Sequence, residues 1–403
     1  MRPISILVII NAMLFGLLYL LVKPLDTFIL IAGAILTLLI LMSYIIIIKT
    51  KMGDQYLFLI ISMLSSLGVV MIYRLDPQFG IKQIVWYGIG VILYFLSYGI
   101  FRWIKNWDRY MYIYIGFGIS LFVLTLLAGV TTKGATNWLS IGGFVFQPAE
   151  IIKLSFVFFL ASYFTYPEML KNEYYFLAIV YLHIGFLVLQ RDMGMAMLFY
   201  GIFISIFYVF CEDKKIFLYN LGSALLILVF GYYTMNHVQV RFEAWLNPWK
   251  DISGRGYQIT QSLFAIATGG FFGTGLGMGN PDYIPEVHTD FIFSAISEEL
   301  GTFGGIAVVL LYFILIYRGF KITLTIRNTF RKILALGITL TYSYQTFVII
   351  GGVIKLIPLT GITLPFISYG GSALISAFMA FGILQGLSKK SLEVEELLDF
   401  GGE

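Results

Sequence analysis

Residues 28–48 read FILIAGAILTLLILMSYIIII, a run of 21 residues without a single charge. A bilayer core about 30 Å thick is crossed by a helix of about 20 apolar residues, so this run predicts a transmembrane helix. The whole chain shares this character, because 59% of its 403 residues are hydrophobic and 12% are charged. An average soluble domain is roughly 45–50% apolar and about 25% charged. The composition therefore excludes an ordinary cytoplasmic enzyme, a disordered chain and a nucleic-acid-binding protein.

Eleven further segments carry the same signal, and together they predict an all-α polytopic membrane protein. The first segment follows Arg2 as a signal peptide would. It lacks a small-residue cleavage site, however, and a second span follows at once, so we expect a retained helix. The twelve predicted spans lie near residues 4–22, 28–48, 55–73, 84–101, 110–130, 148–165, 175–190, 193–211, 216–236, 290–317, 332–350 and 366–388.

Lysines and arginines predict the orientation of these spans, because short cytoplasmic loops are enriched in them. With the N-terminus inside, the inner loops and termini carry 16 Lys and Arg residues, and the short outer segments carry six. We therefore expect both termini in the cytoplasm and one long extracellular loop at 237–289. The acidic segment 391–403 is then a cytoplasmic tail.

Side chains that bind metals are scarce. The chain has one cysteine, Cys211, and three histidines far apart in sequence, His183, His237 and His288. This excludes an intrachain disulfide and a cysteine-based zinc site, and it argues against a histidine cluster. We therefore predict no metal-ligating residues.

The long outer loop contains the glycine-rich run GGFFGTGLGMG at 269–279. Alternating glycines resemble a dinucleotide-binding fingerprint, but that motif needs a strand before it and a helix after it, and this run lies between membrane spans. The run instead predicts a backbone that bends tightly and comes close to another helix or to a phosphate-bearing head group. Plain helix packing through small residues is the alternative.

Two pairs of charged residues lie within or between the predicted spans of the middle of the chain. Each charged side chain is expected to have a structural or functional role, because a charge at mid-membrane costs about 2.5–3.5 kcal/mol on insertion scales. Glu150 and Lys153 stand three residues apart on one helical face and can form an ion pair. Arg191 and Asp192 interrupt two hydrophobic runs. We expect such charges to line a polar cavity in the outer half of the bundle.

Three more carboxylates follow the outer loop. On a continuous helix over 290–317, Asp290 lies near the outer interface, and Glu298 and Glu299 lie deeper and point to different sides. The two glutamates cannot both face lipid. We therefore predict that at least one of them bonds to a basic or hydroxyl group of another helix.

Several motifs, in order, resemble the SEDS family, to which FtsW, RodA and SpoVE belong. The resemblance covers about 55–388 and implies a ten-helix core at 55–390, preceded by two additional transmembrane helices within 1–54. The motifs are PEVHTDFIF at 285–293 with EELG at 298–301, KGATNWL at 133–139, QPAE at 147–150 with Lys153, QRDMG at 190–194, NPW at 247–249, GYQ at 256–258, QSL at 261–263, and LPFISYGGS at 364–372.

The resemblance implies a peptidoglycan glycosyltransferase of the bacterial cytoplasmic membrane. It would polymerise lipid II on the outer face, beside a class B penicillin-binding protein and other proteins of an elongation or division complex. The family's essential aspartate falls on Asp290, and a carboxylate there could take a proton from the acceptor sugar as general base. The substrate-binding residues that the resemblance implies are Lys153, Glu150, Lys133, Arg191, Asp192, His288, Glu298, Glu299 and Ser368.

A diphosphate leaving group must be stabilised by cations. The resemblance assigns this task to Lys153, Lys133 and Arg191, with the neighbouring carboxylates orienting them. Many family members carry an arginine pair where this chain has Thr136-Asn137. Phosphate binding must then rest on other cations or on a divalent ion such as Mg²⁺ or Mn²⁺, and no other cofactor is implied.

Other interpretations stay open. A lipid II flippase would also need many spans, but its charges should lie near the midplane and its halves should be related as repeats. A non-catalytic scaffold is the third class. Within the polymerases, YRLDP at 73–77 is closer to RodA-like than to FtsW-like members, which favours elongation or sporulation over division. For Asp290 itself, the alternative is a helix N-terminal cap.

Overall fold

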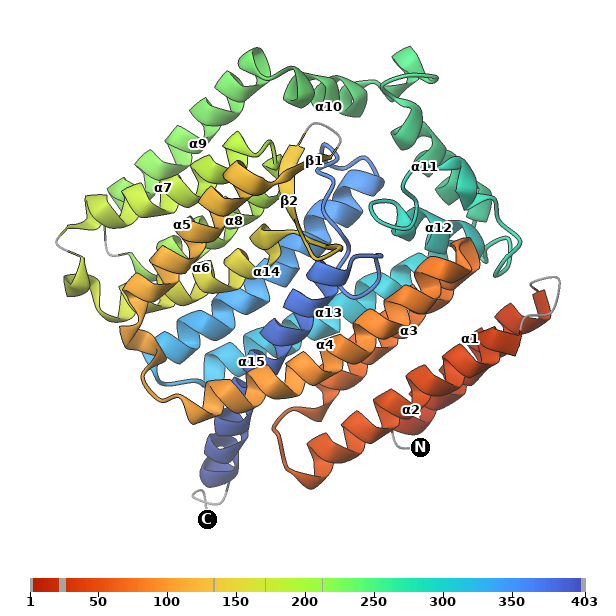
Figure 1. Ribbon diagram of the computed structural model, residues 1–403, viewed down its shortest axis with the longest axis horizontal. Coiled ribbons are helices and arrows are strands. Elements are labelled where there is room, and N and C mark those ends of the chain that lie inside the picture. Colours follow the sequence, from red (N-terminus) through yellow and green to blue (C-terminus); the bar gives the residue numbers. More distant parts are fainter. Residues whose placement is uncertain (1–2, 22–26, 133–134, 171, 212, 400–403) are drawn as a thin grey trace. The chain divides into compact units, whose positions relative to one another are not determined.

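The computed structural model describes residues 3–21, 27–132, 135–170, 172–211 and 213–399. It is built from helices and one small antiparallel sheet (Figure 1). The elements are α1 Pro3–Leu21, α2 Thr27–Lys49, α3 Gln55–Leu75, α4 Pro77–Trp103, η1 Trp107–Arg109, α5 Met111–Ala128, β1 Val130–Thr132, β2 Ala135–Ile141, β3 Phe144–Phe146, α6 Pro148–Thr165, η2 Pro167–Met169, α7 Glu173–Leu189, α8 Met193–Phe210, α9 Lys214–Thr234, α10 Asn236–Leu246, η3 Pro248–Asp251, α11 Tyr257–Gly269, η4 Pro281–Tyr283, α12 Ile292–Glu299, α13 Gly301–Thr325, α14 Thr329–Val353 and α15 Gly371–Asp399.

The chain forms two compact units, each assembled from three separate stretches. The first unit comprises Met1–Val91, Ile227–Leu315 and Gln345–Gly370. The second comprises Ile92–Leu226, Ile316–Tyr344 and Gly371–Glu403.

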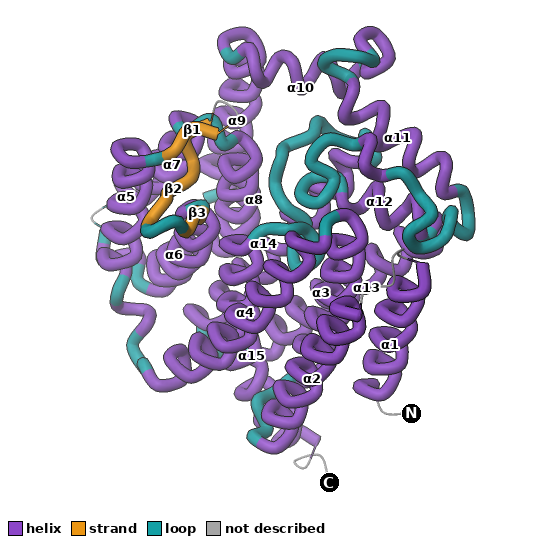
Figure 2. Tube along the Cα trace, turned by 45° about the vertical axis from the view of Figure 1, so that its right-hand side comes forward, coloured by secondary structure: helices purple, strands orange, loops and turns teal. Residues whose placement is uncertain are grey.

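Helix α3 is the most buried of the first three helices of the first unit. Its apolar stretch is 89% buried, against 22% for α1 and 39% for α2. The three helices lie side by side (Figures 1 and 2). Gly33 lets α2 approach α1 closely, because a Cβ there would lie 2.6 Å from Cγ of Phe15. The two N-terminal helices thus pack on α3 within the first unit, and most of the α1 surface is left for lipid.

Helix α6 has the corresponding place in the second unit, where it packs against α5, α8 and α15. It follows a three-stranded sheet with the order β1-β2-β3 (orange in Figure 2). Gly142 and Gly143 join β2 to β3 with φ of +58° and +85°, the two positive values of a type I′ hairpin turn. The all-α class holds for the protein as a whole, and this sheet is the local exception.

Ten helices among the described residues are long and apolar enough to cross a membrane, namely α1, α2, α3, α4, α5, α6, α8, α13, α14 and α15. Of the two remaining predicted spans, α7 is apolar but has 17 residues, and α9 is not among the ten. The prediction of a polytopic membrane protein is confirmed, and ten of its twelve spans meet this criterion.

The prediction of one helix over 290–317 is wrong. Helix α12 ends at Glu299 and α13 begins at Gly301, which has a φ of +69°. Asp290 lies in a turn before α12, so the rotation expected between it and the two glutamates on one helix does not apply. The last helix also begins later than predicted, at Gly371, because residues 364–370 form a loop.

Candidate functional site

Asp290 ends a compact turn at residues 285–290, and its side chain is half-buried. The backbone N–H groups of Thr289 and Asp290 both donate to the carbonyl oxygen of Glu286, at 3.1 and 3.2 Å. Glu286 adopts the left-handed region with a φ of +59°. The cap position of α12 belongs to Phe291, which makes no side-chain cap bond. The alternative interpretation of Asp290 as the N-terminal cap of this helix is therefore wrong.

A second loop fixes the backbone on which Asp290 sits. The Tyr369 N–H donates to the His288 carbonyl at 2.8 Å, and the Ser368 hydroxyl donates to the Thr289 carbonyl. The same hydroxyl accepts from the Leu364 N–H at 2.9 Å. Ser368 is 4% exposed, so its contacts in this structure position the catalytic candidate through the backbone.

The His288 ring packs against aromatic side chains of the same unit. Its centroid lies 4.8 Å from that of Phe79 and 5.9 Å from that of Tyr369. Gln83 of α4 donates to the Ser368 carbonyl at 3.1 Å. Helix α4 and the loop 364–370 therefore both contact the turn and contact each other, which gives Asp290 a defined position.

Arg241 of α10 lies close to Asp290, although 49 positions separate the two residues in sequence. The point where a Cβ of Gly361 would sit is 3.5 Å from Oδ2 of Asp290 and 3.5 Å from Nη2 of Arg241. The two charged groups are therefore at most 7.0 Å apart. The sequence analysis missed Arg241, because a single arginine in a long outer loop carries no local signal.

Glu299 and Arg74 form an ion pair between α12 and α3, with Oε1 and Nε 2.6 Å apart. Both are enclosed, with side chains 0% and 9% exposed. The prediction that one of the two glutamates bonds to a basic group of another helix is confirmed. Arg74 also donates to the Gly279 carbonyl at 2.6 Å and contacts Asp282 at 3.3 Å.

Both glutamates also hold the backbone of the glycine-rich run. Oε2 of Glu299 accepts from the Gly277 N–H at 2.9 Å, and Oε1 of Glu298 accepts from the Asn280 N–H at 2.8 Å. Both side chains are therefore used within the protein. Their predicted contact with substrate stays a prediction.

The glycine-rich run also supplies partners to the broken helix. At the break, the last carbonyls of α12 and the first N–H groups of α13 lose their intrahelical partners. The N–H groups of Thr274 and Gly275 donate to the carbonyls of Glu298 and Glu299, at 2.9 and 3.0 Å. The Thr302 N–H donates to the Gly270 carbonyl at 3.0 Å. The predicted close approach of this run to another helix is confirmed.

The second unit contains the other predicted group of charges. Lys153 forms an ion pair with Oε2 of Glu150, which also accepts from the Ser376 hydroxyl at 2.9 Å. The Lys153 ammonium lies 5.2 Å from the ring centre of Tyr342, and the residue is 0% exposed. The predicted pairing on one helical face is confirmed. The binding of substrate by this enclosed lysine stays a prediction.

Asp192 caps α8 and ties the sheet to the turn between α7 and α8. It accepts from the Met195 N–H at 3.1 Å and from the side-chain amides of Asn137 and Gln147, at 2.8 and 2.6 Å. Burial raises the pKa of the Asp192 carboxyl, against the lowering effect of these three hydrogen bonds. Asn137 thus helps to satisfy this carboxylate.

The other two cations predicted to bind phosphate are Arg191 and Lys133. Arg191 is exposed and has a φ of +61° in the turn before α8, so its guanidinium is accessible from solvent. Lys133 lies outside the described residues. Within the part of the chain that the structure describes, no three His, Cys, Asp or Glu side chains gather as a set of metal ligands.

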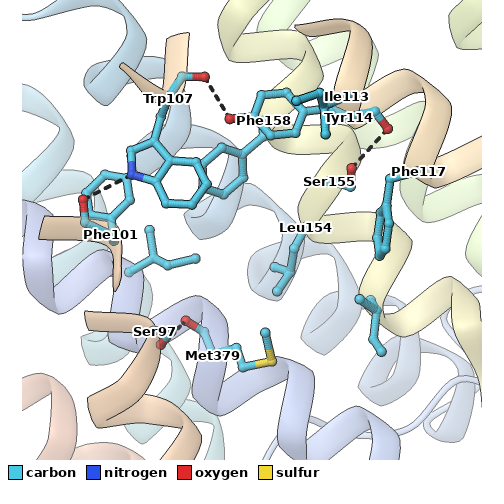
Figure 3. Close-up of a pocket in the computed structure, with 12 residues that line it drawn as sticks. Ser97, Phe101, Trp107, Ile113, Tyr114, Phe117, Leu154, Ser155, Phe158 and Met379 are labelled. Atoms are coloured by element: carbon cyan, nitrogen blue, oxygen red, sulfur yellow. Dashed lines mark hydrogen bonds between the residues drawn. The ribbon is translucent and has the colours of Figure 1, made fainter. Parts of the chain in front are cut away.

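A cavity of about 340 Å³ lies in the second unit, between α4, α5, α6 and α15 (Figure 3). Its polar groups are largely engaged: Tyr114 donates to the Trp107 carbonyl at 2.7 Å, and Ser97 to the Met379 carbonyl at 3.0 Å. It is lined by Ser97, Phe101, Trp107, Ile113, Tyr114, Phe117, Ile151, Leu154, Ser155, Phe158, Met379 and Ile383. This lining suits an apolar group and offers no acid, base or cation for catalysis.

Comparisons with known proteins cover most of the chain. It is 34% identical over 365 residues to the peptidoglycan glycosyltransferase RodA of Mycobacterium tuberculosis, with 83% of this chain and 78% of the relative covered. It is 35% identical over 370 residues to the stage V sporulation protein E of Bacillus subtilis, covering 85% and 99%.

A solved structure agrees with these relatives. It is described as "Structural coordination of polymerization and crosslinking by a peptidoglycan synthase complex", and one of its chains matches with a TM-score of 0.70 and 27% identity. The match covers 84% of this chain and 98% of that one. A family model for FtsW, RodA and SpoVE, described as "Cell cycle protein", matches residues 54–393. The chain therefore belongs to the FtsW/RodA/SpoVE family, the SEDS proteins.

Proposed function

We propose that this chain is a peptidoglycan glycosyltransferase that polymerises lipid II on the outer face of the bacterial cytoplasmic membrane. The observation that carries the proposal is the fixed position of Asp290. Its turn is hydrogen-bonded to Ser368 and Tyr369, and its carboxylate Oδ2 lies at most 7.0 Å from Nη2 of Arg241. A rigidly held acid next to a cation is the arrangement that proton abstraction beside a phosphorylated leaving group needs.

Asp290 acts as the general base. Its carboxylate takes the proton of the acceptor sugar's 4-hydroxyl while that oxygen forms a bond to the anomeric carbon of the donor. The bond from the anomeric carbon to the diphosphate breaks, and the lipid-linked diphosphate leaves with the electron pair. Cations stabilise the negative charge that develops on it. Arg191 and Lys133 remain candidates for this role, and Lys153 with Glu150 and Asp192 organises the second unit.

We also propose the number of spans and their orientation in the membrane. Both termini lie in the cytoplasm, and α7 and α9 complete twelve spans. The two N-terminal helices are additional to the ten-helix core, and the loop that carries Arg241 and the glycine-rich run lies outside. The distribution of lysines and arginines supports this orientation.

The enzyme works beside a class B penicillin-binding protein. We expect the single helix of that partner to pack on α13 and α14. Support comes from α13, whose apolar stretch is 28% buried. Its exposed side chains recur at helical spacing: Phe303, Ile306, Leu310, Phe313 and Tyr317. The cellular role is elongation or sporulation, with division as the alternative. If the chain does not polymerise lipid II, a flippase or a non-catalytic scaffold is the alternative function.

The test is polymerisation of labelled lipid II by the purified full chain with its partner in detergent, where glycan ladders require no transport. Asp290→Asn keeps the volume and removes the proton acceptor, so turnover should fall about 10²–10⁴-fold. Asp282→Asn is the matched control, because Asp282 lies in the same outer loop with a side chain that is 66% exposed. Normal ladders from Asp290→Asn would remove Asp290 from catalysis. No ladders from the wild type would favour the flippase or the scaffold.

A further inference from the structure

We propose that Arg241 and Gly361 form a binding subsite for the diphosphate of the lipid-linked donor, beside Asp290. This inference rests on the proposed function, in which Asp290 is the base. It adds a cation that the family motifs in the sequence do not include.

The guanidinium of Arg241 is held in place from one side. Its Nη1 donates to the Thr360 carbonyl at 2.9 Å, which directs Nη2 toward Gly361. The loop that contains these residues is tied at both ends. The Trp245 indole donates to the Lys355 carbonyl at 3.2 Å, and the Gln345 amide donates to the Thr363 carbonyl at 2.9 Å. A pre-positioned guanidinium loses little conformational freedom on binding.

Gly361 lies beside both charged groups. Its φ of +73° favours glycine, and a Cβ would meet Asp290 and Arg241 at van der Waals distance, 3.5 Å from each. A side chain larger than glycine at this position would therefore press against both groups.

The upper limit of 7.0 Å between Oδ2 of Asp290 and Nη2 of Arg241 keeps both groups within the span of one transfer reaction. A hydroxyl on the base lies about 2.6–3.2 Å from the carboxylate, and an attacking oxygen lies about 3–3.5 Å from the carbon it attacks. The anomeric carbon is then about 6 Å from Asp290, with the leaving oxygen just beyond it. Arg241 lies within reach of that oxygen.

The chemistry of the side chain fits a diphosphate. A guanidinium presents a planar fork of N–H donors that matches phosphate oxygens and stays charged at any relevant pH. Arg241 is exposed, so a ligand can reach it without rearrangement of the protein. Lys153, by contrast, is 0% exposed. Of these two cations, Arg241 is the one placed for direct contact.

The first test measures binding rather than turnover. The full chain in nanodiscs of neutral lipid is titrated with undecaprenyl diphosphate and, in parallel, with undecaprenol, which has no charge. Arg241→Gln should weaken binding of the diphosphate about 10- to 100-fold and leave undecaprenol unchanged. The diphosphate affinity of Arg241→Lys should lie between those of the wild type and Arg241→Gln, because lysine keeps the charge but lacks the planar fork of N–H donors. Arg255→Gln is the control, since Arg255 lies in the same loop on a surface pair with Glu243.

Unchanged diphosphate binding by Arg241→Gln would overturn the subsite, whatever the fate of Asp290. If Arg241→Gln loses binding while Asp290→Asn polymerises normally, the base assignment fails and the subsite stands. The two failures are therefore distinguishable.

The second test changes Gly361. Gly361→Ala places a methyl group 3.5 Å from both Arg241 and Asp290 at a position with positive φ, so both diphosphate binding and polymerisation should fall at least about 10-fold. Gly142→Ala is the matched control, because Gly142 also has a positive φ and a Cβ there meets nothing within 4 Å. Wild-type binding by Gly361→Ala would contradict the proposal.

Discussion

Arg74 holds three groups of the first unit together. Its guanidinium contacts Glu299, the Gly279 carbonyl and Asp282. Since Glu299 is fully enclosed, the pair has little intrinsic gain in stability over an apolar pair. The removal of one partner is costly, because it leaves a buried charge without compensation.

We therefore expect Arg74→Met to destabilise the protein by about 3–5 kcal/mol. Thermal unfolding of the purified protein in detergent, followed by tryptophan fluorescence, measures this as a lower melting temperature. Arg74→Met combined with Glu299→Gln should recover part of the loss, because the unpaired charge is gone. Arg255→Met breaks a surface pair with side chains 56% and 44% exposed, and it should cost at most about 1 kcal/mol. Equal effects of the two single changes would contradict this account.

Helices α12 and α13 form a broken element that the glycine-rich run makes possible. Backbone groups freed by the break need partners, because none are available from lipid. The run can supply them only by close contact. A Cβ on Gly301 would lie 2.3 Å from the Gly273 nitrogen, and one on Gly273 would lie 2.2 Å from the Glu299 carbonyl oxygen.

Gly301→Ala should consequently destabilise the protein by more than about 3 kcal/mol, because the backbones must separate and their hydrogen bonds lengthen. Gly116→Ala, in α5 with open space around its Cβ position, should be neutral or stabilising by up to about 1 kcal/mol. The comparison uses the same melting assay. A Gly301→Ala protein that melts with the wild type would show that the close contact is dispensable.

Ten of the twelve spans that hydropathy predicted correspond to helices long and apolar enough to cross a membrane. Hydropathy succeeds there because each residue that faces lipid must itself be apolar. It could not predict the break at Leu300. A window over 290–317 stays apolar across it, and the partners for the freed groups come from residues 269–280. The sheet was missed for a related reason, since Gly142-Gly143 signals a hairpin only once the flanking strands are recognised. The motifs indicated Asp290. Arg241 is distant from Asp290 in sequence and comes close to it only in the folded chain.

The proposed topology makes a prediction for the molecule as a whole. Cys211 is the single cysteine of the chain, so a Cys211→Ser background allows one thiol to be placed at will. In intact cells, a membrane-impermeant maleimide should label Lys250→Cys, which is exposed in the outer loop, and not Lys51→Cys, which is exposed after α2. Permeabilised cells should label both. The reverse pattern would invert the orientation and place Asp290 on the cytoplasmic side.

The hydrogen bonds between the glycine-rich run and the helix break also bear on local opening. Surface loops normally exchange their amide hydrogens with water far faster than helices do, because they open independently. The amides of Thr274 and Gly275 are bonded to carbonyls of α12, so they open only when the helix end is released. This stretch of loop therefore belongs to the same cooperative unit as the helices, and its exchange rate reports the opening of α12 and α13.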